Sequence, residues 1–128
     1  MKGPIIVTSE MLTADNKAHT AFFEKNVIAK TTDMTLYADA MLVYYNDKSG
    51  DVNKIEATGN VKLHKDTNVV TSQKATYYAG EDKVVFSGEP RAVDGENVVT
   101  GTKMTFFLKD DRTIVENSKV YLKNKKDR

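Results

Sequence analysis

Cysteine and histidine, which carry out much of the covalent and metal chemistry of proteins, are scarce in this sequence. There is no cysteine, and the two histidines, His19 and His64, stand in different sequence contexts. Glu10 and Asp39 follow small residues in two similar segments, and a pair of carboxylates could act together as acid and base. Two further segments hold Gln73 and Thr102 at the same position. The position therefore requires a polar side chain and not specifically an acid.

Sequence motifs of catalysis and ligand coordination are also missing. No GxSxG, HExxH or glycine-rich phosphate loop occurs. No group of Cys and His residues has the spacing of zinc ligands. We therefore expect a protein that is not an enzyme and that uses no metal ion and no other cofactor.

The segments that hold these residues are four imperfect copies of one strand–turn–strand unit. Each copy begins with a small residue followed by a polar one, and these small residues, Ser9, Ala38, Ser72 and Gly101, are 29, 34 and 29 positions apart. A second marker follows in each copy, with spacings of 34, 29 and 29, at Lys25-Asn26-Val27, Gly59-Asn60-Val61, Gly88-Glu89-Pro90 and Asn117-Ser118-Lys119. Two markers that keep nearly the same period indicate stacked supersecondary units.

Length and charge indicate a single domain over residues 1–128, structured from about 5 to 122, with a frayed basic tail at 123–128. The chain has 19 Lys and Arg against 18 Asp and Glu, for a net charge of +1. Apart from the tail, the two signs are interspersed. A nucleic-acid-binding protein usually shows a basic excess or patch, so we expect no nucleic-acid partner.

No apolar run approaches the roughly 20 residues that span a bilayer. The start of the chain offers only Ile5-Ile6-Val7 as an apolar run, which is too short for the core of a signal peptide. If the protein is exported, we expect this chain to be the mature part, with its signal peptide removed. The lack of cysteine is compatible with an oxidising compartment.

Apolar and polar residues alternate along most of the chain, which predicts β-strands from end to end. Within Val69–Ala79 the alternation places Val69 and Tyr77 on one face and Val70 on the other. Asp94-Gly95 predicts a tight hairpin with both residues at the central positions of a type I′ turn. A bulge that inverts the faces of one strand is expected near 117–120, where the fourth copy looks one residue long.

With the four copies in register, one set of alternating positions is repeatedly apolar. These positions predict an apolar lining with a largely polar exterior, because a single hairpin cannot cover its own apolar face. The candidate ligand-binding residues on this lining are Leu12, Met41, Val43, Tyr45, Val61, Leu63, Ala75, Tyr77, Phe86, Met104, Phe106 and Leu108. One ring of each aromatic doublet, such as Phe106-Phe107, should point inward and the other outward.

The same alternation suits a filled core and a slot for an apolar ligand, and it suits a closed barrel as well as a V-shaped trough. Both alternatives stay open at this point. The end strands are exposed unless they are paired.

The order and spacing of several segments resemble the OstA/LptA family of periplasmic proteins of lipopolysaccharide transport. The resemblance runs from about Ile5 to Leu122, and it is carried by the segments Ala38–Met41, Thr58–Leu63, Phe86–Pro90 and Val99–Phe106. It implies an all-β fold of stacked antiparallel strands in a twisted, slightly open β-jellyroll. It also implies a groove that shields the acyl chains of lipid A, and end-to-end assembly into a bridge from the inner to the outer membrane.

The resemblance further implies, as partners, lipopolysaccharide, other copies of the chain, and the inner- and outer-membrane components of the transport machinery, with a periplasmic location. Edge strands near Ile5–Leu12 and Val120–Leu122 are the candidate junctions. The same domain type occurs in the membrane-anchored LptC partner and at the N-terminus of LptD. The alternative hypothesis is a β-repeat scaffold, or an LptC-like or LptD-like domain, with a packed core and no lipid binding of its own.

Overall fold

The computed structural model describes residues 3–123, so the basic tail expected at 123–128 lies, except for Lys123, outside the described residues. Every regular element in the described part is a β-strand, which confirms the predicted all-β class. The strands are β1 (Ile6–Thr8), β2 (Met11–Asp15), β3 (Thr20–Lys30), β4 (Thr35–Tyr45), β5 (Val52–Lys65), β6 (Asn68–Tyr78), β7 (Lys83–Ser87), β8 (Arg91–Asp94), β9 (Asn97–Thr100), β10 (Lys103–Phe107), β11 (Arg112–Glu116) and β12 (Lys119–Tyr121). Residues 3–123 contain no helix that is long and apolar enough to cross a membrane.

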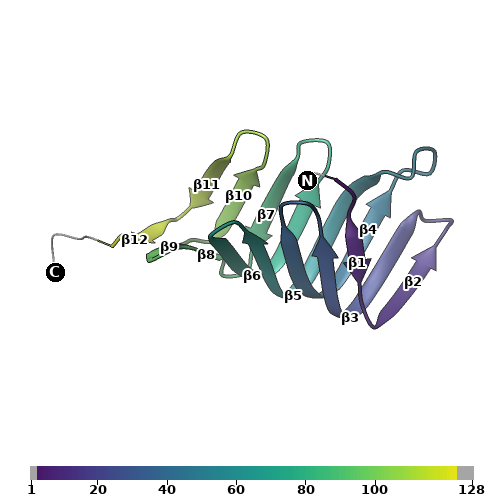
Figure 1. Cartoon of the computed structure of the whole chain (residues 1–128), viewed down its shortest axis with the longest axis horizontal. Coiled ribbons are helices and arrows are strands. Elements are labelled where there is room, and N and C mark those ends of the chain that lie inside the picture. Colours follow the sequence, from purple (N-terminus) through teal and green to yellow (C-terminus); the bar gives the residue numbers. More distant parts are fainter. Residues whose placement is uncertain (1–2, 124–128) are drawn as a thin grey trace.

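All twelve strands belong to one antiparallel sheet that bends into two facing walls (Figure 1). The long strands β3, β4, β5 and β6 run through the bend and contribute one half to each wall. The first wall is completed by β2, β7, β10 and β11, and the second wall by β1, β8, β9 and β12. The strands at the two ends of the sheet do not pair with each other, so the structure is an open trough and not a closed barrel.

The bend forms at the second marker of each repeat. In the first three copies two consecutive residues there have left-handed backbone angles, as at Lys25 and Asn26 (φ 67° and 52°) and at Gly59 and Asn60 (φ 81° and 48°). The strand pairing is interrupted at these positions, between Glu24 and Val27 and between Thr58 and Val61. Such a pair of residues acts as a β-bulge that turns the strand sharply.

The bend also changes which residues face inward, so one sequence expectation is wrong. In β6 the buried residues are Val70 and Ser72 before the bend but Ala75 and Tyr77 after it. The predicted continuous alternation of Val69–Ala79 would have put Val69, not Val70, on the face of Tyr77. Two consecutive exposed residues, Gln73 and Lys74, shift the alternation by one position.

Two turns also differ in detail from the predicted ones. The fourth bend has a single left-handed residue, Asn117, so this copy is one residue shorter than the others, not longer. The Asp94-Gly95 hairpin forms, but Asp94 pairs with Asn97, so its two loop residues are Gly95 and Glu96. Only Gly95 is left-handed there (φ 62°), because a glycine tolerates that angle without steric cost.

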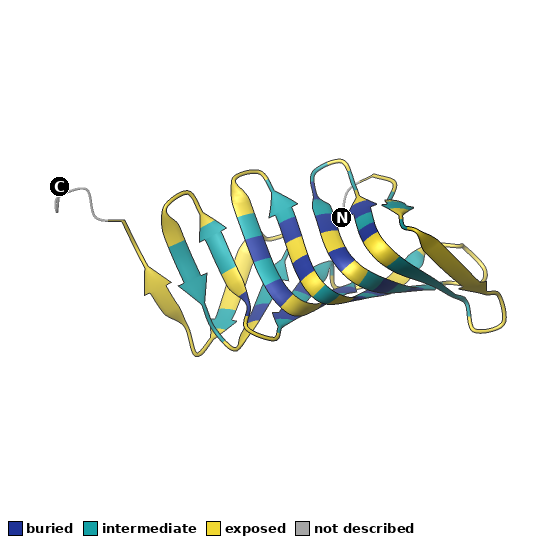
Figure 2. Cartoon of the chain, turned by 90° about the horizontal axis from the view of Figure 1, so that it is seen from below, coloured by how far each residue is buried: buried dark blue, intermediate teal, exposed yellow. Residues whose placement is uncertain are grey.

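Burial is concentrated in the middle of the trough, and the strands at its two ends are exposed (Figure 2). The core consists of apolar side chains that both walls direct inward, from Val27 in β3 to Met104 in β10. Cross-strand register sets these side chains in rows, one of which joins Leu12, Phe23, Met41, Ala57, Ala75, Phe86, Met104 and Val115 across the first wall. The candidate site therefore lies between the walls.

Candidate functional site

Eight of the twelve residues predicted to line a ligand site are buried in the packed middle of the trough. They are Met41, Val43, Val61, Leu63, Ala75, Tyr77, Phe86 and Met104. Phe86 is fully buried, and its ring meets that of Phe106 edge to face with 5.3 Å between the centroids. The structure brings these side chains together as a core with close packing. Leu63 also lines a cavity described below, whereas the fully buried Met41, Phe86 and Met104 would contact a ligand only if the walls separated.

The other four predicted residues lie nearer to the surface. Phe106 and Leu108 are half-buried against the core at the C-terminal end. Tyr45 is half-buried, and its ring lies 6.0 Å from that of His19. Leu12 lies on the inner face of β2 but is 55% exposed, because no further strand covers it.

An open cavity of about 460 Å³ lies between the walls at the C-terminal end of the sheet. Its second-wall side is formed by β6, β8, β9 and β12, and its first-wall side by β10 and β11. Its apolar lining residues on the inner faces of the walls are Val70, Ala92, Val99, Phe106, Val115 and Val120. At this end β8, β9 and β12 pair with β6 and with one another, and β7, β10 and β11 belong to the facing wall.

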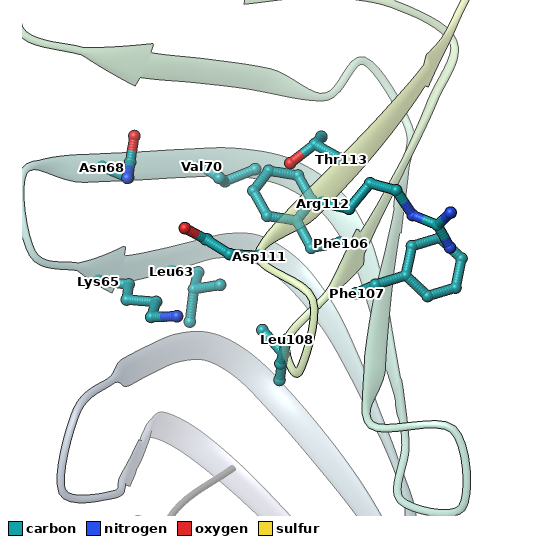
Figure 3. Close-up of a pocket in the computed structure, with 10 residues that line it drawn as sticks. All are labelled: Leu63, Lys65, Asn68, Val70, Phe106, Phe107, Leu108, Asp111, Arg112 and Thr113. Carbon is teal, nitrogen blue, oxygen red and sulfur yellow. The ribbon is translucent and has the colours of Figure 1, made fainter.

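A second cavity, of about 100 Å³, adjoins the first, and the two share Asn68, Val70, Phe106 and Thr113 (Figure 3). Figure 3 shows Phe106 pointing toward Val70 across the space between the walls, while Phe107 points away from it with the Arg112 side chain beside its ring. The guanidinium carbon of Arg112 lies 4.5 Å from the centre of that ring. The doublet Phe106-Phe107 thus places one ring inside and one outside.

The mouth of this smaller cavity carries polar and charged side chains around an apolar floor. Leu63, Val70, Phe106 and Leu108 supply apolar surface, and Lys65, Asp111 and Arg112 are also among its lining residues. A ligand that matches both parts has an apolar portion that enters the cavity and a polar portion that stays at the rim.

One polar group of the interior has an altered acidity. The hydroxyl of Tyr77 donates a hydrogen bond to Asp82 over 3.2 Å. Burial raises the pKa of Tyr77 to about 12, and the carboxylate of Asp82 adds to this shift. Tyr77 therefore stays protonated throughout the physiological range, and it serves the core as a neutral side chain.

The carboxylates considered for acid–base chemistry lie at the bends. Asp39 accepts a hydrogen bond from the Asn60 side chain over 2.9 Å, and Glu10 accepts one from the Asn26 side chain. Among residues 3–123 no group of three or more His, Asp and Glu side chains has an arrangement that could hold a metal ion.

Sequence reasoning missed most of the residues of the open cavity. Val70 was assigned to the opposite face, because the shift at Gln73 and Lys74 was not foreseen. Ala92, Val99 and Val115 lie in short strands of four or five residues. The only signal that could have found them is the Asp94-Gly95 hairpin, since it pairs Ala92 with Val99.

Large exposed apolar residues gather at the two ends of the sheet. Ile6, Met11 and Leu12 lie at the N-terminal end, in β1 and β2. Ile114, Val120, Tyr121 and Leu122 lie at the C-terminal end, in or directly after β11 and β12. Tyr37 is the one residue of this kind elsewhere in the described chain. The edges of the sheet are thus its least covered apolar surfaces.

Comparisons with known proteins point to one family. Residues 6–112 match the family model described as the LptA/(LptD N-terminal domain) LPS transport protein. The structure is similar to the crystal structure of LptH, described as the LptA homologous periplasmic component of the conserved lipopolysaccharide transport device from Pseudomonas aeruginosa. That match has a TM-score of 0.85 and 12% sequence identity, and it covers 94% of this chain and 96% of the other. No curated protein matches the sequence.

Proposed function

Since the chain belongs to the LptA/LptD N-terminal domain family of lipopolysaccharide transport proteins, we propose that it binds the acyl chains of lipopolysaccharide between its two walls. The observation that carries the proposal is the open apolar cavity of about 460 Å³ at the C-terminal end. Each methylene group that leaves water there contributes about 0.8 kcal/mol. An apolar cavity can therefore hold a lipid tail without a dedicated polar site.

The polar rim supports an amphiphile as the ligand. Lys65 can meet an anionic group of a lipid head while Phe106 and Leu63 contact its chains. The buried candidates, such as Met41 and Phe86, would join the binding surface when the walls separate. In this proposal the lipid enters at the C-terminal end. It then moves along the trough as its acyl chains displace the buried side chains in the middle.

The two ends of the sheet support end-to-end assembly. The first wall has eight strands in the order β2-β3-β4-β5-β6-β7-β10-β11, and because neighbours are antiparallel, β2 and β11 run in opposite directions. The second wall, from β1 to β12, also has eight strands and the same property. A second copy placed head to tail would therefore add an antiparallel strand to both walls at once.

Such an assembly would pair the exposed edge strands at both ends and extend the trough. Uncovered edge strands are a liability for an isolated chain. We extend the proposal to a periplasmic bridge between inner and outer membranes, with the membrane components of the transport machinery as partners. The periplasmic location is that of the LptA homologue with the similar structure.

A second candidate function is an assembly module that binds no lipid itself, of a kind that includes LptC-like and LptD N-terminal-type domains. The dense packing of Met41, Phe86 and Met104 in the middle of the trough favours it. The two candidates differ in one property, which is affinity for acyl chains.

Displacement of an apolar fluorophore by purified lipopolysaccharide tests the proposal. Val99→Trp fills the open cavity and should weaken lipopolysaccharide binding by roughly tenfold or more. Val85→Trp is the matched control, since Val85 lies on the outer face of the first wall. Equal affinities of the two variants would contradict the proposed site. An absence of binding by the unmodified chain, together with concentration-dependent association, would favour the assembly module.

A further inference from the structure

One row of residues crosses the outer face of the second wall, and every second strand contributes a basic side chain to it. Strand register places Lys62, Thr71, Arg91, Thr100 and Lys119 side by side in this row, across β5, β6, β8, β9 and β12. Because neighbouring strands are about 4.8 Å apart, the three cations follow one another at intervals of about 10 Å. All three are exposed.

An apolar row lies directly beside these cations on the same face. Register places Val69, Val93, Val98 and Tyr121 next to one another across β6, β8, β9 and β12. The valines are half-exposed and Tyr121 is 51% exposed. His64 and Lys30 continue this row toward β5 and β3. We call the two rows together the basic face.

The charges of the basic face are not compensated within it. Neither row contains an acidic residue, and none of the ion pairs among residues 3–123 involves Lys30, Lys62 or Arg91. On the first wall, by contrast, Lys83, Lys103 and Arg112 each pair with an acid, at 2.9, 3.8 and 4.0 Å.

Acidic side chains near the basic face lie at its margins. Asp66 is in the turn between β5 and β6, Asp94 is the last residue of β8, and Glu96 pairs with Lys123 at 3.8 Å. Glu89 is at the bend, near Lys62. The two rows themselves thus hold no acidic side chain, and Lys119 Nζ lies 5.3 Å from the centre of the Tyr121 ring.

We propose that the basic face binds the anionic surface of a phospholipid bilayer. Phosphate head groups complement the uncompensated cations, and each basic side chain near an anionic membrane strengthens binding by about fivefold. The apolar row and Tyr121 can enter the interfacial region, where aromatic rings and short apolar side chains are favoured. A soluble polyanion would use the cations and leave the apolar row in water, so the combination favours a membrane.

The basic face lies on the opposite side of the wall from the apolar cavity, so the two binding activities can be tested separately. Flotation with vesicles of phosphatidylcholine and 30% phosphatidylglycerol should show binding that vesicles of phosphatidylcholine alone do not. Binding should fall steeply as salt is raised, since ions screen exposed charges. Binding to neutral vesicles at the same strength would contradict the proposal.

The variant Lys62→Glu/Arg91→Glu should bind anionic vesicles at least about tenfold more weakly. Lys74→Glu/Lys103→Glu is the matched control, because it changes the net charge equally on the outer face of the first wall. Equal loss in both variants would show a general charge effect and contradict a specific face. Binding of a soluble polyanion such as heparin without vesicle binding would also overturn the proposal. A variant that loses vesicles but keeps lipopolysaccharide binding separates this surface from the cavity.

Discussion

Asn60 donates a hydrogen bond from its side-chain Nδ2 to Oδ2 of Asp39, over 2.9 Å across the bend between the two walls. Asn26 and Glu10 make the equivalent bond in the first copy, and Asn117 and Thr102 make it in the fourth, over 3.0 Å. In the third copy the backbone N–H of Gln73 donates to the carbonyl of Gly88 over 2.9 Å. The two markers of the repeat therefore contact each other, which explains why they keep the same period.

Gly59 should be the glycine least tolerant of substitution at this bend. It has a φ of 81°, and a Cβ there would lie 2.5 Å from Oδ2 of Asp39. Gly59→Ala combines an unfavourable left-handed angle with a steric clash, and we expect it to lower the free energy of unfolding by at least about 2 kcal/mol. Urea unfolding followed by circular dichroism measures this.

Two other glycines serve as controls for Gly59. Gly50 has a similar φ of 76°, but a Cβ added there would meet no atom within 4 Å, and Gly80 has neither constraint. The expected order of destabilisation is Gly59→Ala, then Gly50→Ala, then Gly80→Ala. Equal effects at Gly59 and Gly50 would show that the contact with Asp39 contributes nothing.

Phe86 should carry a large share of the core's stability. It is fully buried between the walls and contacts the ring of Phe106. Phe86→Ala should lower the free energy of unfolding by about 3–5 kcal/mol, since it removes buried apolar surface and leaves a cavity. Phe107→Ala, on the outer face, should cost about 1 kcal/mol or less. A small loss at Phe86, measured by chemical unfolding, would show that the walls are not packed together in solution.

The uncovered edges should control association between copies. Leu12 lies on β2 at the N-terminal end and is more than half exposed. Leu12→Lys would place a charge in the proposed junction, and we expect at least tenfold weaker self-association in sedimentation velocity. Tyr37→Lys is the control, because Tyr37 is an exposed apolar residue of β4 away from both ends. If both variants associate like the unmodified chain, the proposed junction is wrong.

The raised pKa of Tyr77 predicts a loss of stability in alkaline solution. The unfolded chain releases the phenolic proton near pH 10, whereas the folded chain holds it up to a pKa of about 12. The stabilising effect is therefore fully present below pH 10, and it is lost as the pH rises from 10 to 12. Over this window Tyr77 should account for a decrease of about 2 kcal/mol in the free energy of unfolding.

Tyr77→Phe isolates this contribution from those of the other titrating groups. The variant should lose less stability than the unmodified chain between pH 10 and pH 12, in urea unfolding at each pH. Parallel pH profiles of the two proteins would contradict a buried, proton-retaining Tyr77.

Much of the fold follows from the repeat and the alternation. The four copies predicted the antiparallel strands, and the inward rings of Tyr77 and Phe106 were assigned to the correct face. Alternation works within each wall because successive residues of a strand point to opposite sides. The resemblance to the OstA/LptA family added the open jellyroll, which the structural match supports.

The left-handed residues that form the bends were not predicted from the sequence, and the reason is physical. Lys25 and Glu89 have left-handed angles (φ 67° and 55°), although neither residue type favours that region. The strand pairing on both sides of the bend imposes these angles. The alternation of apolar and polar residues in the sequence gives no information about that pairing. The face of Val70 was misassigned because β6 shifts its alternation at Gln73 and Lys74, where no left-handed residue marks the bend. The open cavity was missed with it, because its lining comes from six strands of both walls.

Site-specific photocrosslinking of lipopolysaccharide at two adjacent residues tests lipid binding between the walls. The side chain at position 106 points into the cavity, and the one at position 107 points outward beside Arg112 (Figure 3). We expect an adduct at Phe106 that excess unlabelled lipopolysaccharide removes, and little or none at Phe107. Equal labelling at both positions, or none at Phe106 in a folded protein, would contradict lipid binding between the walls.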